Sequence, residues 1–204
     1  MRKTTWALIA AIAVAGALWT TTASAQTNAD KLEISAFAVN MSNIATGSNA
    51  MVQITVNAWS TPEERERLIT TVLEKGPDAL LRELQKTPDK GRFRIPTARQ
   101  PDPHKLAMGL DLHYAWQTPL EDGGRRIVLA TDRYIGFQEA RSQPRTIDYP
   151  ITLIEIRVGK DGKGQGKLAY ATKISFNKKD NQLEIENYSS EPVRLNNVEV
   201  KVKK

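Results

Sequence analysis

Apolar side chains that recur at every second position are the feature that most constrains this chain. Successive side chains of a β-strand point to opposite faces, so such an array predicts a strand with one buried face and one wet face. The longest array consists of Leu106, Met108, Leu110, Leu112, Tyr114 and Trp116. Shorter alternating or apolar runs occupy residues 32–38, 51–56, 126–130, 151–156, 167–176, 183–186 and 193–202. Polar, glycine-rich turns separate the runs, which favours an antiparallel meander.

Residues 61–87 depart from this alternation and predict two short helices. Ser60 with Glu63, or Thr61 with Glu64, can form a capping box at the first helix, and Gly76-Pro77 interrupts the segment. Apolar residues then follow helical spacing, namely Leu68, Ile69, Val72, Leu73, Leu80, Leu81 and Leu84. We expect both stripes to pack on the apolar face of the sheet, so that Leu73→Asp buries an unpaired charge.

These patterns together predict an α+β fold that is mainly antiparallel β. The expected architecture is a twisted sheet, or a partly closed barrel or sandwich, with a two-helix insertion near residues 61–87. Arg92–Pro96 is expected to be an extended connection because prolines follow it closely. Residues 193–202 are expected to form a terminal strand, where a charged outer row would protect an edge.

The first 25 residues read as an export signal. Arg2 and Lys3 precede an apolar run, and Ala23-Ser-Ala25 offers a cleavage site before Gln26. The run, Trp6 to Leu18, is about 13 residues long, shorter than the roughly 20 that span a bilayer. We therefore predict a signal peptide over 1–25 and one mature domain over 26–204. The mature chain is expected to be periplasmic or extracellular, with no membrane span.

Composition excludes several chemistries. The 204 residues contain no Cys and only two His, which removes disulfide scaffolds, thiolate nucleophiles and cysteine-based zinc sites. Lys and Arg number 29 against 23 Asp and Glu, and the charge of +6 falls to +4 without the two basic residues of the signal segment. This weak excess, together with export, argues against a nucleic-acid partner.

Three local patterns invite a chemical interpretation. Gly159–Gly166 matches no phosphate-loop or dinucleotide motif and holds one acidic residue, so a flexible hairpin tip is favoured over a phosphate or calcium site. Asp111 and His113 lie two apart on one predicted strand and could face one ligand or metal. The other histidine, His104, falls in a predicted loop. The alternative for His113 is a solvent-facing or hydrogen-bonded histidine on a sheet.

Carboxylates and aromatic residues offer further candidates. Asp132, Glu139, Asp148 and Glu155 are available for carboxylate-pair hydrolysis. In Thr131–Phe137, Tyr134 and Phe137 could line a site and Arg133 could pair with an anion, or the run could anchor the end of a strand. Trp59 and Trp116 are expected to be packing residues. No motif identifies a catalytic, metal-binding or cofactor-binding residue, so we assign none, no cofactor, and lean against an enzyme.

Four segments resemble a family of uncharacterised exported bacterial proteins. They are Ala38–Gly47, Leu80–Lys86, Gly123–Phe137 and Thr146–Pro150. The resemblance covers most of the mature chain and implies export, but it carries no activity, ligand or catalytic residue.

Three functions follow from the sequence. The first is a non-catalytic exported binding or envelope-associated protein with an unknown ligand or envelope component; its oligomeric state is open. The second is an exported hydrolase that uses carboxylates. The third is a basic surface module that adheres to anionic envelope polymers through Lys160, Lys163, Lys167, Lys178, Lys179, Lys203 and Lys204.

Overall fold

The computed structural model describes residues 30–41, 48–98, 105–133, 135, 151–170, 174–177, 182–185 and 193–203. The expected signal segment lies outside these ranges. So do several residues named above: His104, Tyr134, Phe137, Glu139, Asp148, Lys178, Lys179 and Lys204.

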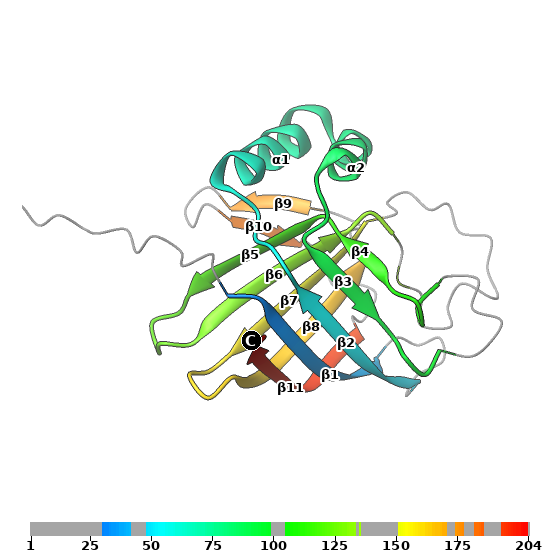
Figure 1. Ribbon diagram of the computed structural model, residues 1–204. Coiled ribbons are helices and arrows are strands. Elements are labelled where there is room, and N and C mark those ends of the chain that lie inside the picture. Colours follow the sequence, from blue (N-terminus) through cyan, green and yellow to red (C-terminus); the bar gives the residue numbers. More distant parts are fainter. Residues whose placement is uncertain are drawn as a thin grey trace, which may run out of the picture.

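Nine strands form one antiparallel sheet in the order β4-β3-β2-β1-β11-β8-β7-β6-β5 (Figure 1). One meander contains β1 (Leu32–Asn40), β2 (Asn49–Val56), β3 (Gly91–Arg94) and β4 (Leu110–Leu112). The other contains β5 (Tyr114–Pro119), β6 (Arg125–Thr131), β7 (Thr152–Val158) and β8 (Lys163–Tyr170). The last strand, β11 (Val193–Val202), joins them by pairing with β1 and β8. A separate hairpin consists of β9 (Ile174–Asn177) and β10 (Gln182–Ile185).

The sheet curls into a nearly closed barrel because its two end strands are consecutive in the chain. Only His113 separates β4 from β5, and its backbone N–H donates to the Ala130 carbonyl of β6 at 2.9 Å. Beside this junction, the backbone N–H of Ser60 donates to the carbonyl of Ala115 at 2.8 Å. The predicted α+β class with a partly closed barrel is therefore confirmed.

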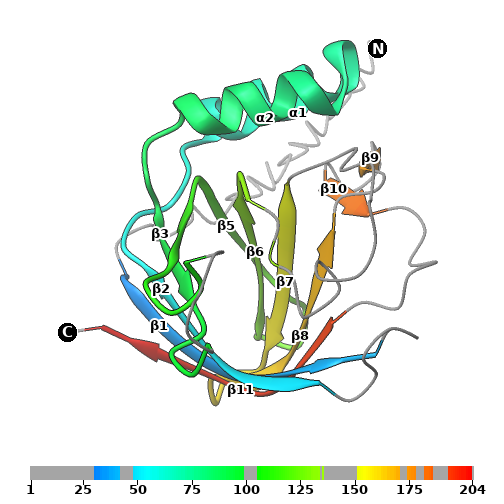
Figure 2. The ribbon, with the colours of Figure 1, turned by 90° about the vertical axis from the view of Figure 1, so that its right-hand side faces the viewer.

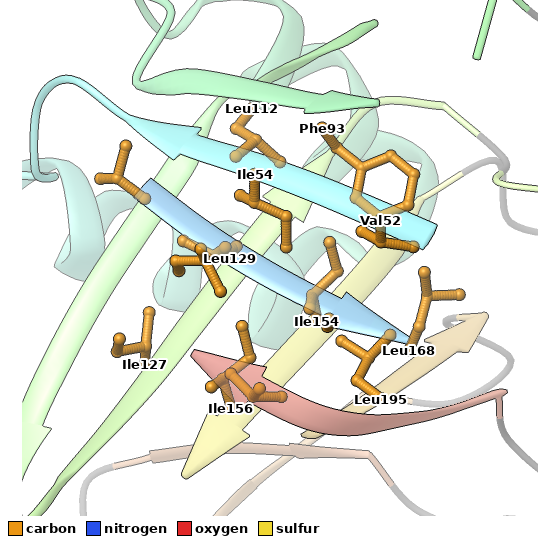
Figure 3. Close-up of a cluster of buried hydrophobic side chains, with 14 of the residues drawn as sticks. Val52, Ile54, Phe93, Leu112, Ile127, Leu129, Ile154, Ile156, Leu168 and Leu195 are labelled. Atoms are coloured by element: carbon orange, nitrogen blue, oxygen red, sulfur yellow. The ribbon is translucent and has the colours of Figure 1, made fainter. Parts of the chain in front are cut away.

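The barrel interior is filled by apolar side chains from alternate positions of the nine strands (Figure 3). On β7, Ile154 and Ile156 point inward and are fully buried, and Ile127 and Leu129 of β6 do the same. Phe93 contributes the largest fully buried side chain. The period of two that the sequence displays is thus the period of the barrel core.

Two helices cover the outer face of β5, β6 and β7. Helix α1 (Pro62–Lys75) begins with the Thr61–Glu64 capping box, and helix α2 (Pro77–Lys86) follows Gly76 directly. Gly76 adopts a φ of 79°, a conformation that glycine reaches without a Cβ penalty. A second apolar cluster joins helices to sheet, and its buried members are Leu68, Leu80, Leu84, Tyr114, Ala130, Ile151 and Leu153.

Leu73 does not belong to this cluster. Its side chain is 53% exposed, whereas Leu68 and Ile69 of the same helix are buried. The expectation that Leu73→Asp buries a charge is therefore wrong. The apolar contact surface of α1 is narrower than the sequence stripe, because the helix touches the convex outside of a barrel rather than a broad inner face.

The long alternating array is divided between two strands with different facings. Residues 106–108 form a turn and Met108 is 76% exposed, while Leu110 and Leu112 point into the barrel. His113 leaves the regular ladder, and the next large side chain, Tyr114, lies in the cluster beneath the helices instead. One residue between the two strands reverses the side of the sheet to which every later side chain points, as a β-bulge does.

Other expected strand boundaries also change. Arg92–Pro96 is not only a connection, because Gly91–Arg94 pairs with β2 and β4 as β3. The expected strand over 167–176 divides into β8 and β9. The predicted terminal strand has the expected bounds, but β11 occupies the middle of the sheet and not an edge. The local alternation of apolar residues predicts that a strand forms. Which strands pair with it depends on segments far away in the chain.

Candidate functional site

One half of the barrel exterior is left uncovered by the helices. In Figure 2, α1 and α2 lie at the top of the molecule, whereas β1, β2 and β11 lie at the bottom. We call the outward-facing side chains of β3, β2, β1, β11 and β8 the open face. Their positions follow from the strand register, which places residues of neighbouring strands side by side in rows.

The central row of the open face is apolar. Phe37 of β1 lies directly opposite Met51 of β2, and the two side chains are 37% and 46% exposed. On its other side Phe37 lies opposite Asn196 of β11. Both side chains point to the solvent side of their strands. The alternate residues of the same strands point inward and fill the barrel, so neither Phe37 nor Met51 is needed for the core.

A bulge in β11 places two amide side chains beside Phe37. The register shifts between Leu195 and Val198, and Asn197 adopts a φ of 49°. Asparagine tolerates this left-handed conformation better than most residues. Asn196 and Asn197 are both exposed, and Asn196 lies opposite Phe37 in the register with Asn197 following it in the bulge. Bulges of this kind often redirect side chains at functional sites.

Cations flank the apolar row on both sides. One neighbouring row contains Arg194 opposite Lys167, and the other contains Arg94 at one end and Lys163 at the other. All four side chains are exposed. Within the second row, Arg94 Nε donates to Gln53 Oε1 at 2.9 Å, which holds the guanidinium over β2. The second row also contains Glu199, directly opposite Lys163, so its cations outnumber its single carboxylate by one. The Phe37–Met51 pair between two rows of net positive charge is the main feature of the open face.

The acidic residues on the open face, and Asp111 of the adjacent β4, have cationic partners nearby. Asp111 Oδ1 lies 2.8 Å from Arg92 Nη2, and Lys201 lies 3.8 Å from Glu199. Glu33 lies 3.7 Å from Lys203, just beyond β11. These exposed pairs contribute little stability. The outward-facing side chains of the five strands still carry more cations than carboxylates, so the open face is positive as a whole.

The second group of interest surrounds His113. Its Nδ1 lies 3.0 Å from the carbonyl oxygen of Thr87, where α2 ends, and its Nε2 lies 3.6 Å from Asp132 Oδ1. Gln85 Nε2 donates to the other Asp132 oxygen at 3.3 Å. Asp111 of β4 bonds Arg92 of β3, while His113 turns toward α2, so the two side chains do not face one ligand. The alternative of a hydrogen-bonded histidine on the sheet agrees with these contacts.

Of the four carboxylates predicted for hydrolysis, Asp132 and Glu155 are described, and each has its own partners. Glu155 accepts from Arg126 Nη2 at 3.1 Å and Arg157 Nε at 2.9 Å. Burial alone would raise the pKa of Glu155, but the hydrogen bonds and charges of these two arginines outweigh it and lower the pKa. Glu155 is therefore held as an anion in an ion-pair cluster beside the helices.

The predicted aromatic candidates pack as part of the structure. Trp59 is buried in the barrel core and its Nε1 donates to the Asp30 carbonyl at 3.0 Å. Trp116 is half-buried under α1, with the Arg65 guanidinium 5.0 Å from its ring centroid. Burial raises the pKa of Tyr114, between these helices and the sheet, to about 12.

The Thr131–Phe137 run is anchored at its described positions. Thr131 and Ile135 are buried, and the Thr152 hydroxyl of β7 donates to the Arg133 carbonyl at 2.9 Å. The same hydroxyl oxygen accepts from the Ile135 N–H at 3.1 Å. These contacts support the anchoring interpretation for this part of the run.

The predicted lysine patch is spread over separate places. Lys163 and Lys167 share the outward side of β8 and belong to the open face, whereas Lys160 lies in the β7–β8 turn and Lys203 follows β11. Phe37 and Met51 were not among the residues predicted from the sequence. Their signal is a large apolar residue on the solvent-facing phase of each of two strands, where Glu33, Ser35, Asn49, Gln53 and Thr55 also lie.

Within the described ranges, no three His, Asp or Glu side chains come close enough together to hold a metal ion. None of the helices in this part of the chain is long and apolar enough to cross a membrane. Comparison with protein-family models, with curated proteins and with solved structures gives no match. The resemblance to a family of exported bacterial proteins therefore stays a prediction.

Proposed function

We propose that this chain is an exported, non-catalytic binding protein that attaches to a component of the cell envelope through the open face. The observation that carries this proposal is the exposed Phe37–Met51 pair on the part of the barrel exterior that α1 and α2 do not cover. Exposed aromatic and methionine side chains grouped with arginines are typical of binding surfaces.

The contacts of His113 and Glu155 support a non-catalytic function, because both side chains are engaged in interactions that stabilise the fold. His113 links the end of α2 to Asp132 beside the barrel junction. Glu155 is held by Arg126 and Arg157, which keeps it ionised and unsuited to act as a general acid. By contrast, Phe37 and Met51 are exposed and do not belong to either apolar cluster.

The test is sedimentation with washed envelope fragments of the source organism. The protein is purified from that organism after removal of the expected signal segment. The double variant Phe37→Thr, Met51→Thr keeps strand-forming residues while removing the exposed apolar surface. Leu73→Gln is the matched control, because it removes an equally exposed apolar side chain from the helical side of the molecule.

We expect the wild-type protein and Leu73→Gln to sediment with the fragments, and the double variant to remain largely in solution. Unchanged circular dichroism and melting temperature would show that all three proteins are folded. Equal sedimentation of all three, or none by the wild type, contradicts the proposal. N-terminal sequencing of the processed protein tests export separately, and the expected first residue is Gln26.

A further inference from the structure

We infer that the partner of the open face is an acidic polysaccharide, whose sugar rings pack on Phe37 while its carboxylates pair with the flanking cations. This inference rests on the proposed binding function and names the class of ligand. The contacts come from three adjacent rows of the sheet. Each row supplies a different component of recognition.

Phe37 supplies an apolar platform. Its ring and Met51 form a shallow apolar strip, and the C–H face of a pyranose ring packs on an aromatic side chain of this kind. Because Phe37 is still about two-thirds covered by its neighbours, it is a platform fixed in the surface and not a protruding wedge. A platform suits a ring that lies flat on a sheet.

Asn196 and Asn197 supply hydrogen bonds at the end of the strip. Each carboxamide has two donor hydrogens and an acceptor oxygen, a combination that matches sugar hydroxyls, which also donate and accept. The β11 bulge exposes both amides next to Phe37. An apolar platform with adjacent amides favours a hydroxylated ring over a purely hydrocarbon partner.

The flanking rows supply positive charge on both sides. Arg94 and Lys163 lie on one side of the strip, in a row that also contains Glu199, and Arg194 and Lys167 lie on the other side, in a row without a carboxylate. Guanidinium groups bind carboxylates through paired, charge-assisted hydrogen bonds. A polymer that carries a carboxylate on successive sugar rings can meet both rows at once. Two copies of this chain, in contrast, would bring like charges together.

The position of these strands in the sheet argues against an extended acidic peptide. β1, β2 and β11 each have hydrogen-bonded neighbours on both sides, so a peptide cannot add a strand beside Phe37. Binding to a bilayer requires apolar side chains that protrude and insert into it, whereas neighbouring residues cover about two-thirds of Phe37. The observations therefore favour a glycan.

The experiment measures binding of the processed protein to four probes by calorimetry. The probes are a polyuronate, a neutral dextran of similar length, polyglutamate, and phosphatidylglycerol vesicles. We expect binding to the polyuronate, weakening steeply as NaCl rises from about 0.05 M to about 0.5 M, because exposed charges are screened. We expect at least about tenfold weaker binding to dextran and polyglutamate, a difference of about 1.4 kcal/mol.

Three variants assign the contacts. The pair Arg94→Gln, Arg194→Gln should lower polyuronate affinity about tenfold or more, since it removes both arginine contacts. The matched pair Lys86→Gln, Lys160→Gln removes the same charge from exposed positions off the open face and should change affinity less than about twofold. Asn197→Gly keeps the bulge, because glycine accepts its φ, and should weaken polyuronate binding.

The outcomes separate the two proposals. Polyuronate binding that is lost equally in both charge pairs, or polyglutamate binding of equal strength, overturns the glycan assignment. Preferred binding to vesicles overturns it in favour of a membrane surface. Envelope sedimentation that depends on Phe37 and Met51 without any polyuronate binding overturns the glycan assignment alone. If sedimentation itself is absent, both the proposed function and its ligand class are overturned.

Discussion

Lys90 Nζ lies 2.8 Å from Glu64 Oε2, and the two side chains are only 7% and 15% exposed. This ion pair joins the first turn of α1 to the residue that precedes β3. The backbone of Lys90 takes part in the same junction, because its N–H donates to the carbonyl of Leu112 in β4 at 2.6 Å. One residue thus connects the helical layer to the barrel.

The Lys90–Glu64 pair predicts a measurable cost for Glu64→Gln. Glutamine retains the capping box but leaves the Lys90 ammonium without its counter-charge in a nearly buried position. We expect a loss of about 2 kcal/mol in the free energy of unfolding, measured by urea titration. The double variant Glu64→Gln, Lys90→Met should regain most of this loss. A single variant as stable as the wild type would show that the pair contributes nothing.

Tyr114 predicts a loss of stability at alkaline pH. Burial raises its pKa in the folded state to about 12, above the ordinary value of 10, so the folded state retains the phenolic proton to higher pH than the unfolded state does. The resulting stability is complete below pH 10 and declines as pH rises toward 12, by about 2 to 3 kcal/mol. Tyr114→Phe should show a correspondingly smaller decline in urea unfolding across this interval. Parallel curves for the two proteins would refute the prediction.

Glu155 predicts the opposite dependence at acidic pH. Because Arg126 and Arg157 lower its pKa in the folded state, the stabilising contribution is present above the unfolded pKa and is lost as pH falls through the folded value. Glu155→Gln should destabilise the protein at pH 7 by about 1.5 to 3 kcal/mol, the range for hydrogen bonds to charged groups. Its thermal stability should also decline less between pH 5 and pH 2, an interval of about three units that spans the usual carboxyl titration.

The helix contact surface predicts different costs for two leucines of α1. Leu68 is 2% exposed and packs against the outer face of the barrel, whereas Leu73 is 53% exposed. Leu68→Ala should cost about 2 to 3 kcal/mol through lost burial and a cavity. Leu73→Ala should change stability by less than about 0.5 kcal/mol, as is usual at the surface. Equal costs would place the contact surface of α1 elsewhere.

The sequence contained enough local information to predict most strands and both helices. The capping residues Thr61 and Glu64 lie at the start of α1, and the bounds of β11 agree with the alternation of its valines. The position of β11 could not be predicted, because pairing with β1 and β8 depends on residues far away in the chain. The reversal at His113 could not be predicted either, because the alternation of apolar residues continues across this residue without a break in the sequence.

The candidate site was harder to predict than the fold. The spacing of Asp111 and His113 predicts that they face the same side of one strand. In the structure Asp111 accepts from Arg92, whereas His113 lies against the carbonyl of Thr87. Phe37 and Met51 carry no motif, and they become neighbours only through the register between β1 and β2. Arg94 and Arg194 are 100 positions apart in the numbering and meet the same apolar strip from opposite sides.

β11 also has a kinetic consequence. It is the last of the described strands to leave the ribosome, yet both meanders need it to become one sheet. Until it arrives, β1 and β8 each present an unsatisfied backbone edge, and barrel closure waits for contacts between distant parts of the chain. Such late completion leaves the sheet open until β11 has been synthesised, a delay that is compatible with the export proposed above.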